Sequence, residues 1–196
     1  MPSKSNMTED EIVAASLQQF WRDGYHATSI EKLVASTGAN RQAIYAAFGG
    51  KQALYLRCFA TYYETVVEPA LADLFSSAAS LEQIEQYFET QIALAERGGL
   101  AGSGCFVANA ATETAPHDDK AAEEVRLHME RLTAGFSNAL GNGAPNLQFE
   151  DREALAEMLA SFAQGLWSIS RTVSNASILR RQAATMISLL KERISP

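Results

Sequence analysis

The sequence predicts an all-α protein, with a small N-terminal helical unit followed by a larger helical domain. Three segments open with the capping-box pattern, a Ser or Thr followed three residues later by Glu or Gln, at Thr8, Thr28 and Ser80. Apolar residues recur at helical spacing along most of the chain, and no alternation of apolar and polar residues persists as a strand would require. Glycines stand at the joints, where helices commonly end.

The composition is that of an ordinary globular protein, with 196 residues of which 47% are hydrophobic and 20% charged. No apolar run approaches the roughly eighteen residues that a helix needs to cross a bilayer. Residues 1–6 contain no hydrophobic stretch typical of a secretory signal. We therefore expect a cytoplasmic protein without a membrane segment.

The cysteines and histidines suggest neither a disulfide framework nor a metal site. Cys58 and Cys105 lie in different contexts without CxxC spacing, and the three histidines are scattered. The best candidate for a catalytic pair is Glu113 with His117, and no paired carboxylates or nucleophile–base arrangement accompanies it. We expect no metal, no cofactor and no enzymatic activity.

The net charge of −7 by itself disfavours a nucleic-acid-binding protein, but the charge is unevenly distributed. Residues 1–59 carry six Lys or Arg against five acids, whereas residues 60–196 carry ten against eighteen. The acidic part would be repelled by phosphates, which leaves the N-terminal part as the plausible contact surface for DNA.

Three helices are expected in the first fifty residues, running from Thr8 to Gly24, over about 29–36 and over about 41–47. The second opens at the capping box of Thr28, and Asn40 is a good N-cap for the third. Two short helices joined by a glycine turn form a helix-turn-helix, in which one helix lies in the major groove and its neighbour braces it.

The third of these helices carries residues suited to reading DNA. Its inner face holds Ile44 and Phe48, and the exposed face and its start hold Asn40, Arg41, Gln42 and Tyr45. Such side chains contact base edges and phosphates. Lys51 follows Gly49-Gly50 at the start of another helix, where a positive side chain and free backbone N–H groups suit a phosphate.

The segment Ile12–Ile30, continuing through Gly38, Ile44-Tyr45, Phe48 and Lys51–Leu54, resembles the DNA-binding domain of the TetR family over about residues 8–56. The resemblance implies that Thr28 and Tyr45 contact phosphates, that base edges face Arg41, Gln42 and Ala43, and that Lys51 anchors the backbone. The full set of expected DNA-contacting residues is Thr28, Ser29, Asn40, Arg41, Gln42, Ala43, Tyr45 and Lys51. Gln19 departs from the aliphatic residue usual in the family, which predicts weaker packing on that side of the first helix.

The last two helices, expected over about 150–173 and 176–193, are apolar around much of their circumference, so both faces need cover. One hypothesis is that a second copy of the chain covers one face in a four-helix interface. The other is that the two helices form an internal core pair. The residues expected at the interface are Leu155, Leu159, Phe162, Leu166, Ile178, Ala183, Ile187 and Leu190. A two-fold dimer would present two recognition helices to a palindromic operator.

Aromatic residues between the two ends of the chain indicate an apolar pocket for an unknown small-molecule effector. The candidate lining residues are Tyr62, Tyr87, Phe88, Cys105, Phe106, Met129, Phe162 and Trp167. The acidic, aromatic-rich composition of this region favours an apolar or cationic ligand over an anionic one.

Cys105 follows the glycine-rich loop 98–104 and is expected in the first turn of a helix, where the helix dipole lowers the pKa of a thiol. One hypothesis is therefore a sensor of electrophiles or oxidants. The alternative is a buried structural cysteine.

The resulting prediction is a DNA-binding domain over residues 1–50 and a ligand-binding and dimerisation domain over 51–196. The family resemblance implies a homodimeric repressor that a small molecule releases from its operator. The alternatives are a repressor that senses through the thiol of Cys105 and a helical interaction module without a DNA role, which the acidic total would suit.

Overall fold

The computed structural model describes residues 7–98, 100 and 102–194, and all regular elements in these ranges are helical, without a strand. The predicted all-α class is confirmed. Residues 1–6, assessed above for a secretory signal, and Gly99 and Ala101 of the predicted loop lie outside the described residues. None of the described helices is long and apolar enough to cross a membrane.

The N-terminal unit consists of α1 (Glu9–Asp23), α2 (Ile30–Thr37) and α3 (Arg41–Phe48). The first capping box is present, because Thr8 Oγ1 accepts from the backbone N–H of Glu11 at 3.2 Å and the Glu11 carboxylate accepts from Thr8 N at 2.8 Å. Asn40 caps α3 as predicted, its side chain accepting from Ala43 N at 2.8 Å.

The predicted capping box at Thr28 is wrong. Ser29, one residue later, is the N-cap of α2 and accepts from Lys32 N at 3.3 Å. Thr28 is fully buried, and its hydroxyl donates to the Gly24 carbonyl at 2.7 Å. This hydrogen bond spans the turn between α1 and α2 and stabilises it.

The next helical segment is irregular on both sides of Pro69. The order is α4 (Lys51–Tyr62), a π-helical turn (Tyr63–Val67), α5 (Glu68–Leu71) and a 3₁₀ turn (Ala72–Phe75). Proline has no N–H to donate within a helix and its ring crowds the preceding turn, so the regular ladder of hydrogen bonds gives way at this point.

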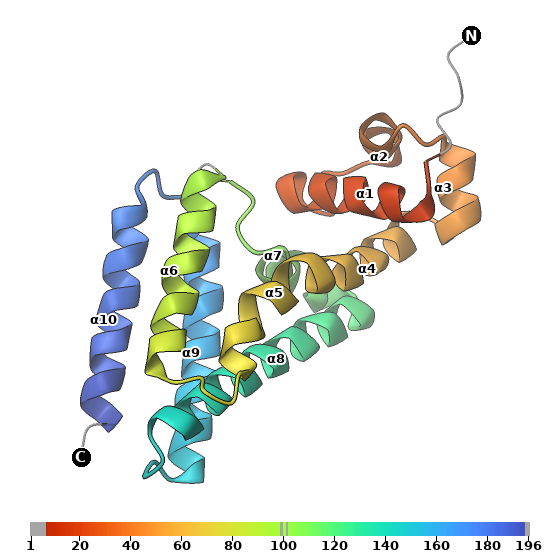
Figure 1. Cartoon of the computed structure of the whole chain (residues 1–196). Helices are drawn as coiled ribbons and strands as arrows, with labels where there is room; N and C mark the ends of the chain where they lie inside the picture. The colour runs from red at the N-terminus through yellow and green to blue at the C-terminus, as the bar shows by residue number, and fades with distance from the viewer. Residues whose placement is uncertain (1–6, 99, 101, 195–196) are drawn as a thin grey trace.

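The remaining helices form the C-terminal part, where α8 packs along α9 and α10 packs along α6. Figure 1 shows α1–α3 gathered at one end of the molecule and α6, α9 and α10 at the other, with α4 and α8 running between them. The helices are α6 (Leu81–Arg97), α7 (Phe106–Glu113), α8 (Asp119–Gly143), α9 (Phe149–Ser170) and α10 (Ala176–Ile194). The capping box at Ser80 is present at the start of α6.

One hydrophobic core runs through both ends of the molecule. Phe20 of α1 contacts Tyr55 of α4 with ring centroids 5.1 Å apart, and Tyr55 contacts Phe106 of α7 at 5.4 Å. The helix-turn-helix therefore packs directly on the C-terminal helices. A division of the chain at residue 50 stays a prediction.

Candidate DNA-binding surface and ligand cavity

The start of α3 presents polar side chains to solvent while the opposite face is anchored in the core. Ile44 is fully buried, whereas Arg41 and Gln42 are exposed and Tyr45 is 45% exposed. Ser29, at the start of α2, is exposed as well, and Ala43 is half-buried. This is the arrangement that a recognition helix needs, since base edges can be reached only by side chains that the fold leaves free.

Arg41 has two partners on this surface. Its Nη1 lies 3.3 Å from Glu31 Oε1, and its guanidinium lies 5.7 Å from the centre of the Tyr45 ring. Both members of the ion pair are mostly exposed, so the pair contributes little to stability and a phosphate or base can replace Glu31.

The Thr28 side chain does not face this surface, contrary to the expectation from the family resemblance. It is fully buried, and the hydrogen of its hydroxyl is donated to the Gly24 carbonyl. A phosphate contact by that side chain would have to break this bond, so the expected side-chain contact at Thr28 is not supported.

Lys51 begins α4 at the edge of the same surface. Its Nζ lies 4.1 Å from the centre of the Tyr25 ring, and partial burial lowers the pKa of its ammonium while the charge of Glu113 opposes that shift. Gly50, the N-cap of α4, supplies no side-chain cap. Since glycine has no side chain that could accept from them, the first backbone N–H groups of α4 lack a side-chain cap. A site that binds phosphate through the backbone needs such uncapped N–H groups.

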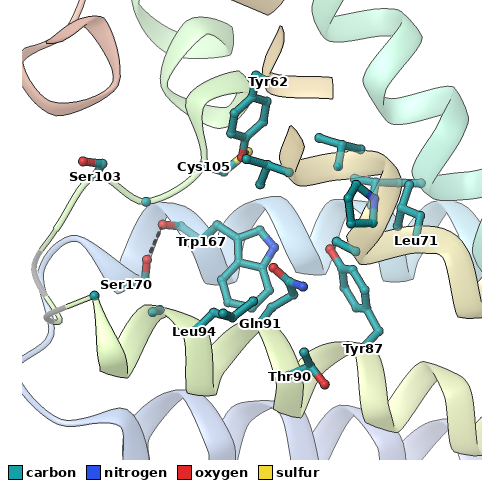
Figure 2. Close-up of a pocket in the computed structure, with 18 of the residues that line it drawn as sticks. Tyr62, Leu71, Tyr87, Thr90, Gln91, Leu94, Ser103, Cys105, Trp167 and Ser170 are labelled. Carbon is teal, nitrogen blue, oxygen red and sulfur yellow. Dashed lines mark hydrogen bonds between the residues drawn. The ribbon is translucent and has the colours of Figure 1, made fainter. Parts of the chain in front are cut away.

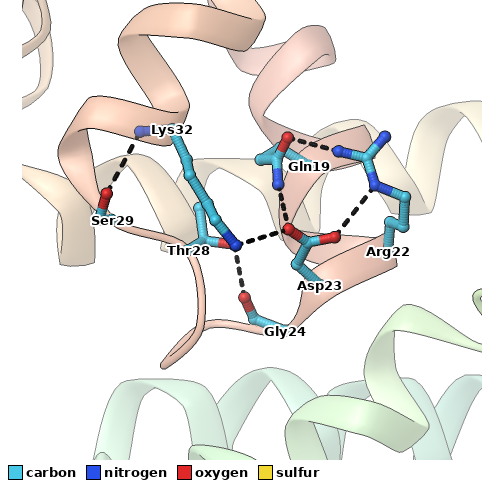
Figure 3. A network of polar contacts seen from close by, with 7 residues as sticks. All are labelled: Gln19, Arg22, Asp23, Gly24, Thr28, Ser29 and Lys32. Carbon is cyan, nitrogen blue, oxygen red and sulfur yellow. Dashed lines mark hydrogen bonds and ion pairs between the residues drawn. The ribbon is translucent and has the colours of Figure 1, made fainter.

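A network of polar side chains ties the end of α1 to α2 (Figure 3). Asp23 Oδ2 accepts from Gln19 Nε2 at 2.7 Å and from Lys32 Nζ at 3.0 Å, and Arg22 pairs with Asp23 Oδ1 at 3.0 Å. Hydrogen bonds from Lys32 and Arg22 lower the pKa of Asp23. Gln19 is buried and donates to Asp23. A hydrogen bond therefore takes the place of the apolar packing that an aliphatic residue would make at this position.

Glu113, at the end of α7, holds the turn that follows α1. Its carboxylate accepts from the backbone N–H groups of Tyr25 at 2.9 Å and His26 at 2.8 Å. Gly24 makes room for it, because a Cβ at Gly24 would lie 2.8 Å from Glu113 Oε2. The residue that the sequence offered as half of a catalytic pair is thus a structural clamp between the C-terminal helices and the helix-turn-helix.

A second link joins α1 to the loop before α7. Trp21 Nε1 donates to the Gly104 carbonyl at 2.9 Å, and the Trp21 indole meets the Tyr62 ring edge to face at 5.0 Å. Two separate contacts therefore connect α1 and the turn after it to the two ends of α7.

Behind Trp21 lies a cavity of about 630 Å³. Figure 2 shows it between α6 and the helices that carry Tyr62, Leu71 and Trp167. Four of the predicted lining residues, Tyr62, Tyr87, Cys105 and Trp167, line it together. The other four do not: Phe88 and Phe106 are fully packed into the core, and Met129 and Phe162 pack against it.

Several lining residues were missed by the sequence prediction, and most of them are polar. Gln18 and Trp21 come from α1, Gln91 from α6, and His128 and Gln164 from α8 and α9. His128 and Gln164 interrupt the otherwise apolar inner faces of their helices, which is the signal that could have revealed them.

Comparison with known proteins agrees with this geometry. Residues 12–58 match the family model described as bacterial regulatory proteins, tetR family. The transcriptional repressor ComR of Escherichia coli is 27% identical over 191 residues, which covers 94% of this chain and 90% of ComR. Residues 12–58 thus form a DNA-binding domain of the TetR type, and the whole chain is similar to TetR-family transcriptional regulators. It is a DNA-binding transcriptional regulator.

Solved structures of TetR regulators share the whole fold. A regulator from Chloroflexus aurantiacus superposes with a TM-score of 0.79 at 22% identity, over 94% of each chain. A cysteine variant of CifR, described in complex with a 26-base-pair operator, superposes with a TM-score of 0.74 at 20% identity, over 96% of this chain and 98% of CifR.

Cys105 is the N-cap of α7, one residue before the predicted first turn, but the pKa of its thiol is not lowered. Its Sγ accepts from Ala108 N and from the Tyr62 hydroxyl, both at 3.4 Å. Burial raises the pKa of the thiol and outweighs these hydrogen bonds. The structure therefore favours the alternative of a buried structural cysteine over the hypothesis of a reactive thiolate.

His128, on the cavity wall, is neutral at physiological pH. Gln164 Nε2 lies 3.0 Å from His128 Nε2, which therefore acts as the acceptor. Burial, helped by the charge of Arg131, lowers the pKa of His128 from 6.5 to about 4.

The face that α9 and α10 present outward differs from the predicted one. Five of the expected interface residues are buried within their own protomer: Leu159, Leu166, Ala183, Ile187 and Leu190. Leu155, Phe162 and Ile178 are half-buried. The exposed stripe of α9 consists instead of Ala154, Met158, Ser161, Gly165 and Ile169. Packing against α7, α8 and α10 takes up the more apolar sides of α9.

No group of three or more metal-ligating side chains occurs among the residues that the structure describes.

Proposed function

We propose that this TetR regulator is a homodimeric repressor, which binds a palindromic operator and releases it when a small molecule occupies the cavity behind Trp21. One observation carries the proposal: Gln18 and Trp21, which line that cavity, belong to α1 of the DNA-binding unit. An occupant would therefore touch the helix-turn-helix itself.

The route from the cavity to DNA follows the contacts of Trp21 and α7. An occupant that displaces Tyr62 or the Gly104 backbone disturbs the partners of Trp21 directly. A shift of α7 would also move Glu113, which holds the turn between α1 and α2. Either movement changes the position of α3. A ligand can cause this change only if it binds more tightly to one of the two conformations than to the other.

The proposed DNA contacts are those that the fold leaves accessible. Base edges are read from the start of α3, and phosphates are bound by Tyr45 and by the first turn of α4. The residues are Ser29, Asn40, Arg41, Gln42, Ala43, Tyr45 and Lys51. The sign of regulation follows the related protein ComR, which is a transcriptional repressor.

The proposed dimer contact is the exposed stripe of α9. A glycine inside a helix costs about 1 kcal/mol relative to alanine, yet a Cβ at Gly165 would meet no atom of its own protomer within 4 Å. Met158 and Ile169 on the same stripe are each 42% exposed. Close approach of a second copy would cover these side chains and account for the glycine.

The DNA surface is tested by fluorescence anisotropy with the DNA upstream of the protein's own gene. Tyr45→Ala should weaken binding by about tenfold or more, because it removes a phosphate contact and a partner of Arg41. Phe75→Ala removes a similarly exposed aromatic side chain from outside the DNA-binding unit and should leave the affinity unchanged. Equal losses in both variants would contradict the assigned surface.

The coupling is tested with Trp21→Phe, which keeps an aromatic ring but loses the hydrogen bond to Gly104. Operator affinity should fall by about three- to tenfold, because a net intramolecular hydrogen bond contributes about 1 kcal/mol. Trp167→Phe makes the same change in a wall residue that belongs to α9 rather than α1, and it serves as the matched control. An unaltered operator affinity in Trp21→Phe would remove Trp21 from the route.

The dimer is tested by light scattering. Gly165→Glu places a charge on the stripe without meeting an atom of its own protomer and should yield monomers. Ala134→Glu, at an exposed position of α8, should keep the mass of the unmodified protein. A Gly165→Glu protein of unchanged mass would place the interface elsewhere.

A further inference from the structure

We propose that the cavity selects an uncharged effector with a flat, largely aromatic body and hydrogen-bonding groups at its edge. The inference rests on the proposed function, since it takes the cavity as the effector site. It is carried by the chemistry of the described cavity wall, which offers rings and amides but no buried counter-charge for an ion.

The wall contains almost no charged side chains. Among the described residues that line the cavity, Asp73 is the sole Asp, Glu, Lys or Arg, and it is exposed at the rim. Arg171 packs close to Gly104 at the edge, but its Nη1 donates to Asn109 Oδ1 at 3.0 Å. Within the described part of the wall, no cation is therefore available to bind a carboxylate or phosphate.

The remaining titratable groups on the wall are neutral at physiological pH. Burial raises the pKa values of Tyr62, Tyr87 and Cys105, and it lowers the pKa of His128 to about 4. An ionised ligand would lose its hydration on entry and find no opposite charge except, for a cation, that of Asp73 at the exposed rim. This disfavours anions and cations alike, whereas the composition of the chain disfavoured only anions.

The polar groups that do line the wall are suited to a neutral partner. The amides of Gln83, Gln91 and Gln164 are half-buried on this wall. Gln83 Oε1 already accepts from Ser80, so Gln83 can offer a ligand its amide nitrogen. Gln164 Nε2 bonds to His128, so Gln164 can offer its amide oxygen, and Gln91 can offer both groups. Thr90 and Ser103 add hydroxyl groups. Carbonyl, hydroxyl or amide groups on a ligand would satisfy such side chains without a net charge.

The apolar part of the wall consists of rings from several helices. Tyr62, Tyr87 and Trp167 project into the cavity from α4, α6 and α9 (Figure 2). Tyr87 and Trp167 meet edge to face with ring centroids 6.5 Å apart. Planar rings bind such walls through offset stacking and edge contacts, and a volume of about 630 Å³ accommodates a molecule of more than one ring.

The test uses three probes of one shape that differ in charge: 2-naphthamide, 2-naphthoate and 2-naphthylmethylammonium. Dissociation constants are measured by isothermal titration calorimetry at pH 7.5 with the full-length protein. We expect 2-naphthamide to bind at least about tenfold more tightly than either ion. An ion that binds as tightly as the amide would overturn the proposal, and so would the absence of binding by all three probes at about 1 mM.

A charge placed in the cavity provides the second arm. Gln91→Lys should bind 2-naphthoate at least about tenfold more tightly than the unmodified protein, because the wall then holds a counter-charge. Gln148→Lys, an identical change at the exposed start of α9, should leave the binding of 2-naphthoate unaltered. Equal gains in both variants would show that the probe binds outside the cavity.

Failure of this inference can be distinguished from failure of the proposed function. Binding of operator DNA by the unliganded protein depends on α3 and not on the probes. If 2-naphthamide binds selectively but leaves operator affinity unchanged, the charge selectivity of the cavity stands and release by a cavity ligand is refuted. If an ion both binds best and releases the operator, the proposed function stands and the neutral effector is refuted.

Discussion

Polar side chains on the DNA-binding face are exposed and pair with one another, whereas those at the junction between α1 and α7 are sheltered and bond to the backbone. The junction consists of the contacts that Trp21 and Glu113 make between these two helices and the turns beside them. On the DNA face, Arg41 and Glu31 form an ion pair whose side chains are 63% and 73% exposed. At the junction, Glu113 and Trp21 bond to backbone groups in partly buried surroundings. Exposed pairs are weak and exchange partners readily, whereas sheltered hydrogen bonds to the backbone define one geometry. The first region is suited to changing partners, and the second to transmitting a shift.

The largest effect is expected at the junction, from Gly24→Ala. Gly24 has a φ of +86°, and a Cβ there would lie 2.8 Å from Glu113 Oε2. Backbone strain and loss of the clamp should together lower the free energy of unfolding by about 3 kcal/mol or more, measured by urea denaturation.

Gly49→Ala is the matched control for this substitution, because Gly49 also has a positive φ of +81° but a Cβ at this position would meet no atom within 4 Å. It should cost only the backbone strain, about 1 kcal/mol. Adding Glu113→Ala to Gly24→Ala should recover part of the loss. Equal costs at the two glycines would show that Glu113 does not define this turn.

The buried His128 should make stability depend on pH. Its pKa is about 4 in the folded protein and 6.5 when exposed, so the unfolded chain binds the extra proton between these values. Its contribution is therefore complete above pH 6.5 and is lost as the pH falls from 6.5 to about 4, by up to about 1.4 kcal/mol per pH unit.

Urea denaturation between pH 7.5 and 4.5, compared with His128→Gln, measures this contribution. The variant keeps an acceptor for Gln164 and should show a flatter profile. Burial raises the pKa of the nearby Glu124 in both proteins, so the difference between the two profiles isolates the histidine. Parallel profiles would mean that His128 takes up its proton in the folded state.

A smaller effect is expected on the DNA face, where charges act on affinity more than on stability. Arg41→Ala should weaken operator binding by about 10- to 100-fold. Glu31→Gln should strengthen it by about two- to fivefold, because the partner that competes with DNA for Arg41 is removed.

Fluorescence anisotropy at several salt concentrations measures both effects. Arg97→Ala, at the end of α6, removes the same charge away from α3 and should change the affinity little. A Glu31→Gln protein that binds DNA less well would mean that the ion pair positions Arg41 for binding.

The smallest effect is expected for Asp23→Asn in the network between α1 and α2, below about 1 kcal/mol by urea denaturation at pH 7. Hydrogen bonds from Lys32 and Arg22 lower the pKa of Asp23 below its ordinary value of 3.8. This stabilisation is therefore present at neutral pH and is lost only as the pH falls below that value, outside the range of His128. If Asp23→Asn lowered the free energy of unfolding as much as Gly24→Ala does, exposed polar pairs would stabilise the protein as much as the sheltered contacts of Glu113, contrary to this comparison.

Local patterns in the sequence were sufficient to predict the helices and the DNA-binding unit. Capping by Thr8, Asn40 and Ser80 depends on side chains within three residues of the groups they satisfy, so it can be predicted without the fold. The short length of α3 also explains which of its positions are exposed. Only the side around Ile44 packs into the core, so the side chains on the other sides of the helix remain exposed to solvent.

Long-range packing decided what local patterns could not. Apolar residues on nearly every side of α9 did not reveal which side its own protomer would cover, and Leu159 and Leu166 proved to be interior. Half of the residues predicted to line the cavity do so, and polar lining residues such as Gln164 were missed because they come from helices distant in the chain. The burial that raises the pKa of Cys105 is likewise a property of the assembled fold.

The sequence by itself thus determined the helical class, most helix ends and the recognition helix, because these depend on contacts within one or two turns. The tertiary structure alone decided that Trp21 lines the cavity, that Glu113 holds the turn after α1 and that Gly165 lies on the open face of α9. Each of these depends on which segments distant in the chain lie side by side.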